Sequence, residues 1–461
     1  NVLRYFDIEF DEGAGFDDTD PRNAYGPYFQ RQRVEIYHTY AKSLVERGLA
    51  YPCFCTEEEL DKVRAKQEED KVLTGYYGEY ATCRNLSYEE IEANIKAGKP
   101  YVLRLRSQGS PDKEITFVDA IKGEIKLPEN IHDIVLLKKD GIPTYHFAHA
   151  IDDHLMRTTT VVRGGEWLAS APIHYELFHL LGFKMPAYAH TAHLMKFDEE
   201  TGGKRKLSKR KDPELSLDYY RKDGYHPYTM KVYLLTLLNS NFEEWHEKFP
   251  DKDINEFPFS VEKMNQSGAL FDKDKLHNIC KNELSKLSEE ELYDFLYDWA
   301  KENEPENVEK WFGDREKMLQ ILRLYMGVGA KRRRKDLMYA KQIFELISYF
   351  FDGESAEEMD EFKLDEDMVS KILKSYLAKY DHNDDNSVWF NKLKEIADEH
   401  GFASDMKAYK ANPENFKGNV SDIAEAVRIA VTGRANTPDL WTIVHIMGEE
   451  QMTERIKKHI K

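Results

Sequence analysis

The sequence predicts an α/β protein in its first half and an all-α region in its second. Three observations support this prediction. A short apolar run at residues 158–162 leads through a Gly-Gly turn into a helical pattern that ends at Gly182, which is one half of a βαβ unit. Helical and strand-like segments mix between residues 51 and 142. From about residue 225 onward most segments have helical spacing.

The first strong helix is predicted just before Gly48, from apolar residues at helical spacing: Ile36, Tyr37, Tyr40, Ala41, Leu44 and Val45. Two capping boxes, Thr56 with Glu59 and Ser87 with Glu90, predict the starts of two further helices. Residues 101–106 and 134–137 are strand-like. The turn at Asp140-Gly141 predicts a hairpin that continues into a strand over residues 144–151.

The second half is predicted to be helical, without a Gly/Ser linker, a repeat or a low-complexity block. The clearest helical patterns cover residues 230–239, 289–302, 316–326, 340–350 and 388–401. Turns at Asn412-Pro413 and at residues 433–438 interrupt the last stretch. We therefore expect an all-α region over about residues 291–461.

Composition excludes several classes of protein. The 461 residues carry a net charge of −18, and 41% of them are hydrophobic, which is too apolar for a disordered polyelectrolyte. No apolar run approaches the roughly 18–20 residues that span a bilayer, and no signal-peptide pattern opens the chain. Four cysteines do not make a disulfide scaffold, so a reducing, cytoplasmic location is expected. Net acidity still permits nucleic-acid binding through local basic patches.

The basic run at residues 204–211 is the first candidate site. Lys206 and Lys209 lie three residues apart and can bracket a triphosphate, stabilising the charge that develops on pyrophosphate. The alternative is a solvated basic loop.

The second candidate site includes Arg163, which follows the predicted strand at 158–162. A guanidinium at a strand end can hold a carboxylate through two hydrogen bonds, and Tyr145 on a neighbouring strand can add a hydroxyl group. Taken without context, His146 and His149 are better explained as core or rim histidines. Asp152 and Asp153 would point to opposite faces of a strand, so no joint metal or acid–base role is expected.

Cys53, Cys55 and Cys83 form half of a zinc-site pattern. No fourth cysteine or histidine follows closely, and the nearby Tyr76, Tyr77 and Tyr80 are poor substitutes. We therefore expect less than one zinc ion per chain and treat these residues as small, partly buried thiols.

A basic pentamer at residues 331–335 lies inside the helical half. Arginine can pair with RNA phosphates and stack on bases, so Arg332, Arg333 and Arg334 are candidates for RNA contacts. The alternative is a solvated or nuclear-localisation-like patch.

Taken in order, these segments resemble a bacterial-type glutamyl-tRNA synthetase, a class I aminoacyl-tRNA synthetase. The resemblance extends over essentially the whole chain. It rests on the motifs Tyr25-Gly-Pro-Tyr28, Ala50-Tyr-Pro-Cys-Phe-Cys55, Pro143-Thr-Tyr-His-Phe-Ala148, Ile151-Asp-Asp-His-Leu-Met156, Val162-Arg-Gly-Gly-Glu-Trp-Leu168, Lys206-Leu-Ser-Lys-Arg210, Ala426-Val-Arg-Ile-Ala-Val-Thr-Gly433 and Ile446-Met-Gly448.

The resemblance implies a Rossmann-type class I catalytic domain with an α/β insertion, followed by an all-α anticodon-binding domain. Residues 1–50 would form the remainder of the first Rossmann half and residues 51–142 the insertion that binds the tRNA acceptor arm. Residues 143–212 would form the second Rossmann half with the Lys-Leu-Ser-Lys-Arg loop. Residues 213–290 would contact the tRNA stem, and residues 291–461 would bind the anticodon.

The implied reaction uses ATP with Mg²⁺, L-glutamate and tRNA, and it passes through a glutamyl-adenylate. The family pattern assigns catalysis to Lys206 and Lys209, with Ser208, Lys209 and Trp167 binding ATP. It assigns glutamate binding to Tyr145, His149 and Arg163, where His149 replaces an Asn that relatives often carry. The family also implies a monomer, and Arg332, Arg333 and Arg334 would contact tRNA.

One family signature, the His-Ile-Gly-His-type tetrapeptide, does not occur in the sequence. The resemblance places it before Asn1, together with an arginine and a glutamate of the amino-acid pocket, so we expect the sequence to hold only part of the active site. A non-catalytic tRNA-binding or regulatory paralogue, a glutaminyl-tRNA synthetase relative and a glutamyl-queuosine synthetase are the alternatives. The helical second half argues against the last two, which carry anticodon-reading β-barrels or no anticodon domain.

Overall fold

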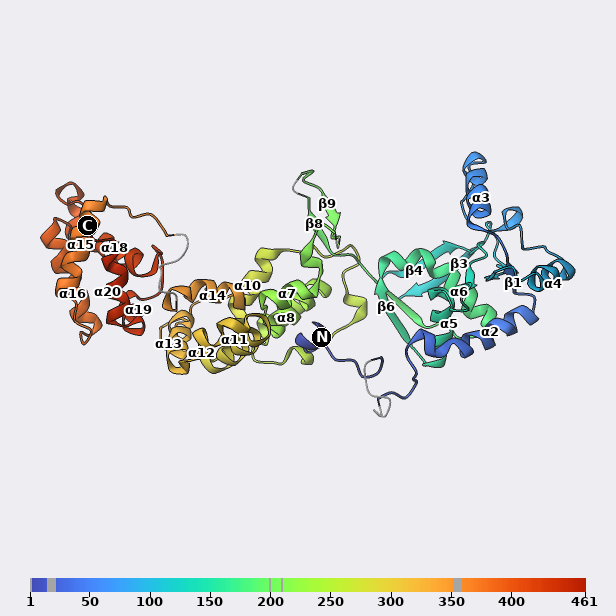
Figure 1. Cartoon of the computed structure of the whole chain (residues 1–461), viewed down its shortest axis with the longest axis horizontal. Helices are drawn as coiled ribbons and strands as arrows, with labels where there is room; N and C mark the ends of the chain where they lie inside the picture. The colour runs from blue at the N-terminus through green and yellow to red at the C-terminus, as the bar shows by residue number, and fades with distance from the viewer. Residues whose placement is uncertain (1, 15–21, 199, 209, 352–358) are drawn as a thin grey trace. The chain divides into compact units, whose positions relative to one another are not determined.

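The computed structural model describes residues 2–14, 22–198, 200–208, 210–351 and 359–461. The chain divides into two compact units (Figure 1). The sheet unit contains Ile8–Leu207 and Leu234–Phe271, and the helical unit contains Asn1–Asp7, Ser208–Tyr233 and Asp272–Lys461. The domain boundaries expected from the sequence at residues 50, 142, 212 and 290 stay predictions.

The sheet unit contains three sheets. A four-stranded mixed sheet has the order β4–β3–β7–β6, in which β3, β7 and β6 are parallel and β4 is antiparallel to β3. An antiparallel sheet has the order β1–β2–β5, and β8 pairs with β9 as a hairpin. The strand bounds are β1 Ala50–Cys53, β2 Val102–Leu105, β3 Glu114–Asp119, β4 Gly123–Pro128, β5 Val135–Leu137, β6 Thr160–Gly164, β7 Ala187–Thr191, β8 Met195–Phe197 and β9 Lys204–Lys206.

The predicted strand–turn–helix is confirmed. Strand β6 leads through a 3₁₀ turn at Gly165–Ser170 into α6 (Ala171–Leu181), and β7 then returns parallel to β6. Gly182 ends α6 at φ 74°, a left-handed conformation that favours glycine. This crossover places the last residues of β6 and β7 side by side at the carboxyl edge of the sheet, where open α/β sheets bind ligands.

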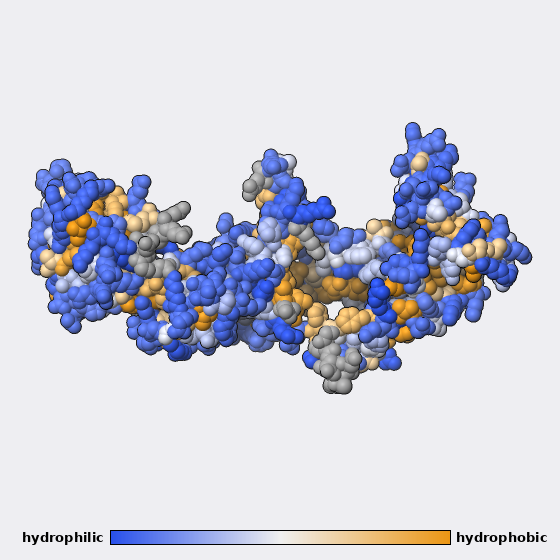
Figure 2. Space-filling model, viewed as in Figure 1, coloured by the Kyte–Doolittle hydropathy of each residue, from blue (hydrophilic) through white to orange (hydrophobic). Residues whose placement is uncertain are grey.

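The early helices also follow the sequence pattern. Helix α2 covers Val34–Glu46, and both predicted capping boxes are present at the starts of α3 (Glu57–Glu69) and α4 (Tyr88–Lys96). Helix α3 has a largely hydrophilic surface (Figure 2). A further helix of the sheet unit, α9, covers Phe242–Lys248.

The expected hairpin strand at 144–151 is wrong. The segment is helix α5 (Tyr145–Leu155), which packs against α2 and α6. Its buried residues Phe147, Ala148, His149, Ala150 and Ile151 are consecutive, so their burial does not alternate as it would in a half-buried strand. Because the segment packs into the core that it shares with α2 and α6, the Asp140-Gly141 turn leads into a helix rather than into the second strand of a hairpin.

The helical unit confirms the all-α prediction among its described residues. Its large apolar core is built from segments between Leu284 and Ile456. The helix bounds are α1 Val2–Tyr5, α7 Leu217–Asp223, α8 Pro227–Leu238, α10 Lys273–Leu284, α11 Glu289–Asn303, α12 Val308–Phe312, α13 Arg315–Met326, α14 Ala340–Ile347, α15 Glu366–Lys379, α16 Asn386–His400, α17 Met406–Ala411, α18 Val420–Thr432, α19 Leu440–Met447 and α20 Glu449–Lys457; the last turns of α8 belong to the sheet unit.

Within the described part of the chain, no helix combines the length and hydrophobicity needed to cross a membrane.

Candidate functional site

Three side chains meet at the carboxyl edge of the parallel strands. Arg163 on β6 pairs in register with His190 on β7, so their side chains project from the same face of the sheet. Asp119 is the last residue of β3, the strand on the other side of β7. The order of strands therefore lines up Asp119, His190 and Arg163 across three neighbouring strand ends.

Arg163 is held by neutral groups rather than by a carboxylate. Its Nε donates to His190 Nε2 at 3.0 Å, its Nη1 donates to His174 Nδ1 at 3.2 Å, and its guanidinium lies 4.4 Å from the centre of the Tyr188 ring. The buried Nη2 has no hydrogen-bond partner among the residues that the structure describes. Arg163 thus keeps an uncompensated charge and a free donor, which suits an anionic ligand.

The contacts of Arg163 fix the protonation of two histidines. Because a guanidinium can only donate, His190 Nε2 and His174 Nδ1 must both accept. His190 therefore carries its proton on Nδ1, which donates to Asp119 Oδ2 at 2.6 Å. His174 carries its proton on Nε2, which lies 2.9 Å from His146 Nδ1. Both imidazoles are neutral in this arrangement.

Burial accounts for the neutral histidines. Desolvation, with help from His149 and Arg163, lowers the pKa of His174 to about 2. Desolvation also lowers the pKa of His190, against the opposing effect of the hydrogen bond that His190 donates to Asp119. Burial opposes ionisation of Asp119, but hydrogen bonds from Lys122, His190 and Ile121 outweigh it and lower the pKa of that carboxyl. Arg163 and Asp119 are therefore charged while the histidine between them is neutral.

Aromatic side chains from α5 and the 3₁₀ turn lie beside Arg163. The Tyr145 ring lies 4.5 Å from Trp167 and stacks on His149 at 5.6 Å. Tyr145 is 45% exposed, so part of this residue is open to solvent. Both ring nitrogens of His149 are engaged inside the protein, Nδ1 with Asp153 and Nε2 with Tyr188 Oη at 2.8 Å. The structure thus brings together Tyr145, His149, Arg163 and Trp167.

The two aspartates of α5 have separate structural partners. Asp152 accepts hydrogen bonds from Arg33 Nε at 2.9 Å and Tyr37 Oη at 2.7 Å, which ties α5 to α2. Asp153 pairs with His149 one turn earlier on the same helix. The expectation that they share no site holds, but the reason is different, because they lie on a helix and not on a strand.

The Lys-Leu-Ser-Lys-Arg segment begins on the β8–β9 hairpin. Lys206 Nζ donates to His193 Nε2 at 3.3 Å, and His193 Nδ1 lies 3.4 Å from Glu166 in the turn after β6. This chain of contacts connects Lys206 to the turn that carries Trp167. In the helical unit, the backbone N–H of Ser208 donates to Asp212 at 2.7 Å. Lys209 lies outside the described residues.

The three cysteines of the sheet unit converge. The Sγ atoms of Cys53, Cys55 and Cys83 all lie within 4.8 Å of one another. Tyr76, judged a poor substitute ligand from the sequence, places its Oη 3.4 Å from Cys53 Sγ and 3.2 Å from Cys55 Sγ. Hydrogen bonds with Cys55 and Cys83 lower the pKa of Cys53, so the cluster stabilises a thiolate. Three converging thiols, with a phenol oxygen beside two of them, are candidate ligands for a structural zinc ion.

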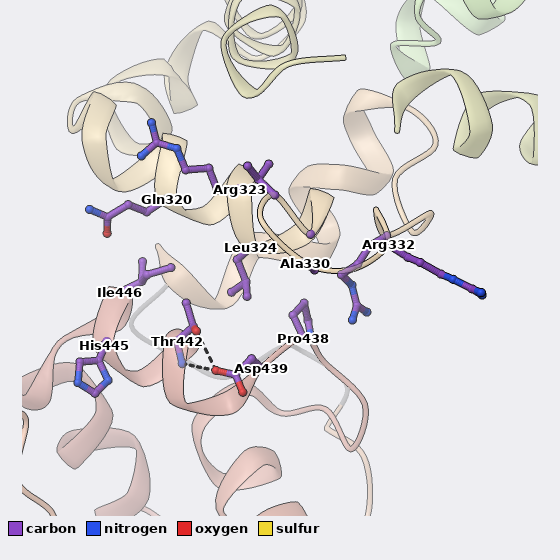
Figure 3. A pocket seen from close by; sticks show the side chains of 13 residues that line it. Gln320, Arg323, Leu324, Ala330, Arg332, Pro438, Asp439, Thr442, His445 and Ile446 are labelled. Carbon is purple, nitrogen blue, oxygen red and sulfur yellow. Dashed lines mark hydrogen bonds between the residues drawn. The ribbon is translucent and has the colours of Figure 1, made fainter. Parts of the chain in front are cut away.

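The basic pentamer forms part of a loop between α13 and α14 and borders a cavity of about 720 Å³. Side chains from α13, this loop and α19 line the cavity, among them Arg323, Arg332, Arg334, Thr442 and His445 (Figure 3). Arg334 pairs with Asp336 at 2.6 Å, whereas Arg332 and Arg333 are exposed. Apolar walls with arginines at the rim suit an unstacked base and its phosphate.

Comparison with known proteins decides the family. Residues 2–278 match the model of the class I tRNA synthetase catalytic domain (E and Q). The glutamate–tRNA ligase of Acetivibrio thermocellus is 53% identical over 99% of this chain and 83% of its own length. The chain belongs to the glutamate–tRNA ligase family. A second family member, from Clostridium perfringens SM101, is 46% identical over 100% of this chain and 83% of its own.

The remaining comparisons agree with this family. Residues 291–460 match an anticodon binding domain. A crystal structure described as a glutamate tRNA ligase from Elizabethkingia meningosepticum in complex with its amino acid has a TM-score of 0.73 and 25% identity, covering 99% of this chain and 87% of that one. The Rossmann-type class I fold with a helical anticodon-binding region, expected from the sequence, is confirmed.

Three residues that lie beside or behind Arg163 in this candidate site were not predicted from the sequence. Asp119, His174 and His190 contact one another or Arg163, but they come from different elements and form no local motif. The alternation of Ile115 and Phe117 with Glu114 and Thr116 is a sequence signal that could have predicted β3 and placed Asp119 at its end. The short run before His190 could likewise have predicted β7 and its pairing with β6.

Proposed function

We propose that this protein attaches L-glutamate to tRNA in two steps that consume ATP. A carboxylate of glutamate attacks the α-phosphorus of ATP, which releases pyrophosphate and forms glutamyl-adenylate. A hydroxyl of the terminal tRNA ribose then attacks the acyl carbon and releases AMP. The observation that carries the proposal is Arg163, whose charge has no carboxylate partner among the described residues and whose Nη2 is a free donor.

Arg163 is the proposed anchor for one carboxylate of glutamate. The neutral state of His174 and His190 leaves its positive charge available to a ligand. Tyr145 is exposed beside it and can donate its hydroxyl proton to the same ligand. His149 is proposed to form a wall of the pocket by stacking on Tyr145, since both of its ring nitrogens already have protein partners.

ATP is proposed to bind at the turn after β6, with Mg²⁺ on its phosphates. Lys206 and Lys209 would stabilise the charge that moves onto pyrophosphate. Ser208 and Trp167 would contact the nucleotide. The contacts from Lys206 through His193 to Glu166 support the assignment, because they link this lysine to the turn that carries Trp167.

The loop containing Arg332, Arg333 and Arg334 is proposed to bind the anticodon arm of tRNA. It lies in the segment that matches an anticodon binding domain, and it borders a cavity with both apolar and cationic walls. Arginines with exposed guanidinium groups can neutralise phosphates of the anticodon loop.

Zinc bound by Cys53, Cys55, Cys83 and Tyr76 is the proposed structural metal site of the sheet unit. The expectation of less than one zinc per chain depended on the missing fourth ligand, and the position of Tyr76 Oη supplies a candidate. A metal there would cross-link β1 to the loop that contains Cys83.

A charging assay tests the proposed function. The full-length protein is incubated with ATP, Mg²⁺ and purified glutamate or glutamine tRNA, and the transfer of labelled glutamate or glutamine is measured. We expect glutamate to be attached to glutamate tRNA and glutamine to be attached to neither tRNA. Transfer of glutamine would favour the glutaminyl-tRNA synthetase alternative, and tRNA binding without transfer of either amino acid would favour a non-catalytic paralogue.

A further inference from the structure

The Asp119–His190 pair is one of the most deeply buried polar contacts in the sheet unit. Asp119 is 1% exposed and His190 is fully buried. Asp119 Oδ1 accepts from the backbone N–H groups of Ile121 at 3.0 Å and Lys122 at 2.9 Å. Oδ2 accepts from His190 Nδ1 at 2.6 Å and from its backbone N–H at 3.1 Å. Both oxygens of Asp119 therefore accept from N–H groups, which leaves no acceptor for a proton on this carboxylate.

This set of donors controls the proton on His190. With its Nδ1 proton directed at Asp119, the imidazole presents an unprotonated Nε2 to Arg163 Nε at 3.0 Å. The other tautomer would place an N–H group against the N–H of Arg163. Burial without a second negative group also keeps His190 uncharged, so the imidazolium form does not compete.

We propose that Asp119 and His190 are positioning residues that orient Arg163 for glutamate binding. The inference rests on the proposed function and goes beyond it, because neither residue needs to touch the substrate. Asp119 sets the tautomer of His190, His190 fixes Nε of Arg163, and Nη2 of Arg163 is then directed to the ligand. A guanidinium that is already oriented loses less conformational entropy when it binds a carboxylate.

A purely structural role is the competing explanation, in which the pair only ties β3 to β7. Two substitutions of His190 separate the roles. In His190→Asn the amide nitrogen takes the place of Nδ1, so the contact with Asp119 remains and the acceptor for Arg163 is lost. In His190→Gln the longer amide reaches the place of Nε2, so an acceptor for Arg163 remains and the contact with Asp119 is lost.

The experiment measures KM for glutamate and for ATP, and kcat, in tRNA charging by the full-length protein and these variants. Loss of a hydrogen bond to a charged group weakens binding about tenfold or more. We expect His190→Asn to raise KM for glutamate by at least about tenfold while KM for ATP stays within about twofold. We expect His190→Gln to keep KM for glutamate within about threefold, although it melts at a lower temperature.

Asp119→Asn provides an independent test of the tautomer. Its amide can donate to His190 Nδ1, which moves the imidazole proton to Nε2 and opposes Arg163. We expect a raised KM for glutamate with an unchanged KM for ATP. Should Asp119→Asn fail to fold, the two His190 variants decide the question by themselves.

Two results would overturn the positioning role. One is an unchanged KM for glutamate in a folded His190→Asn variant. The other is a larger rise in His190→Gln than in His190→Asn, as expected if the pair only ties the strands together. If the wild-type protein does not charge glutamate at all, the proposed function fails together with this inference. If the wild type charges glutamate and the variants keep its KM, only the positioning role fails.

Discussion

At the scale of single residues, the candidate site depends on an arginine surrounded by uncharged hydrogen-bond partners. Imidazoles accept from Arg163 without neutralising it, whereas a carboxylate partner would compete with the ligand for the same charge. The guanidinium is planar, so the hydrogen bonds of Nε and Nη1 fix its orientation, and Nη2 remains free to donate to a ligand.

Replacing Arg163 by lysine should weaken glutamate binding selectively. A lysine keeps the charge but cannot hold contacts to His174 and His190 while reaching the ligand. We expect Arg163→Lys to raise KM for glutamate at least about tenfold and to leave KM for ATP nearly unchanged, as measured by charging kinetics. Arg157→Lys, at an exposed arginine before β6, is the matched control. An equal rise of both KM values would indicate a structural support of the sheet instead.

Buried neutral histidines also make stability depend on pH. An unfolded histidine takes up a proton below about pH 6.5, whereas folded His174, with a pKa lowered to about 2, stays neutral. The unfolded state therefore binds more protons as the pH falls, and stability decreases from about pH 7 toward pH 5.

This effect can be assigned to His174 by urea denaturation at several pH values. We expect the wild-type free energy of unfolding to fall below pH 6.5, with His174 contributing up to about 1.4 kcal/mol per pH unit. His174→Gln keeps a donor for His146 but does not titrate. The slope of its free energy of unfolding against pH should therefore be smaller than that of the wild type by the contribution of His174. Equal slopes in the two proteins would rule out His174 as the group responsible.

At the scale of elements, the basic loop of the helical unit is shaped by the end of α13. Gly327 ends this helix at φ 67°, and a Cβ there would lie 3.0 Å from the backbone nitrogen of Arg334. The missing side chain lets Arg334 N–H donate to Met326 O at 3.0 Å, which folds the loop back onto the helix end. The fold of the loop thus places Arg332 and Arg334 at the edge of the cavity.

Neutralising this loop should weaken tRNA binding in a salt-dependent way. We expect simultaneous substitution of Arg332, Arg333 and Arg334 by glutamine to lower tRNA affinity and to flatten the slope of log affinity against log salt by roughly 2. The measurement is tRNA binding across a salt series. Substitution of all three arginines by lysine is the control. Lysine keeps the charge that binds phosphates, so tRNA affinity should be retained if the arginines contact phosphates and should fall if they recognise bases. An unchanged affinity and slope in the glutamine variant would make the loop a solvated surface.

The cysteine cluster should hold one zinc ion per chain. Metal analysis of the purified protein should find about one equivalent, which Cys53→Ser abolishes and Tyr76→Phe weakens because each removes a ligand. Cys280→Ser is the matched control, because Cys280 is buried in the helical unit and belongs to no cluster of metal-ligating residues among the described residues. A wild-type protein without zinc would contradict the assignment.

At the scale of the whole molecule, local signals predicted the helices well. The patterns at 289–302 and 316–326 match α11 (Glu289–Asn303) and α13 (Arg315–Met326), because capping residues and glycines mark their ends. The βαβ element around Arg163 was predicted for the same reason, since a strand, a Gly-Gly turn and a helix ended by Gly182 are consecutive in the chain.

The rest of the site depends on contacts between distant segments. Asp119 and His190 are 71 residues apart, and they meet only because β3 and β7 are neighbours in the sheet. Tyr76 reaches the thiols through a loop whose course no local pattern describes. Helix α5 was mistaken for a strand because the Asp140-Gly141 turn is typical of a hairpin, whereas packing against α2 and α6 decides the conformation of the segment.

The most direct measurement of the central claim is an experimental structure of the protein with L-glutamate bound. We expect a glutamate carboxylate oxygen about 2.7–2.9 Å from Nη2 of Arg163, with Nε of Arg163 still donating to His190. A glutamate bound away from Arg163, with Nη2 left without a partner, would contradict it.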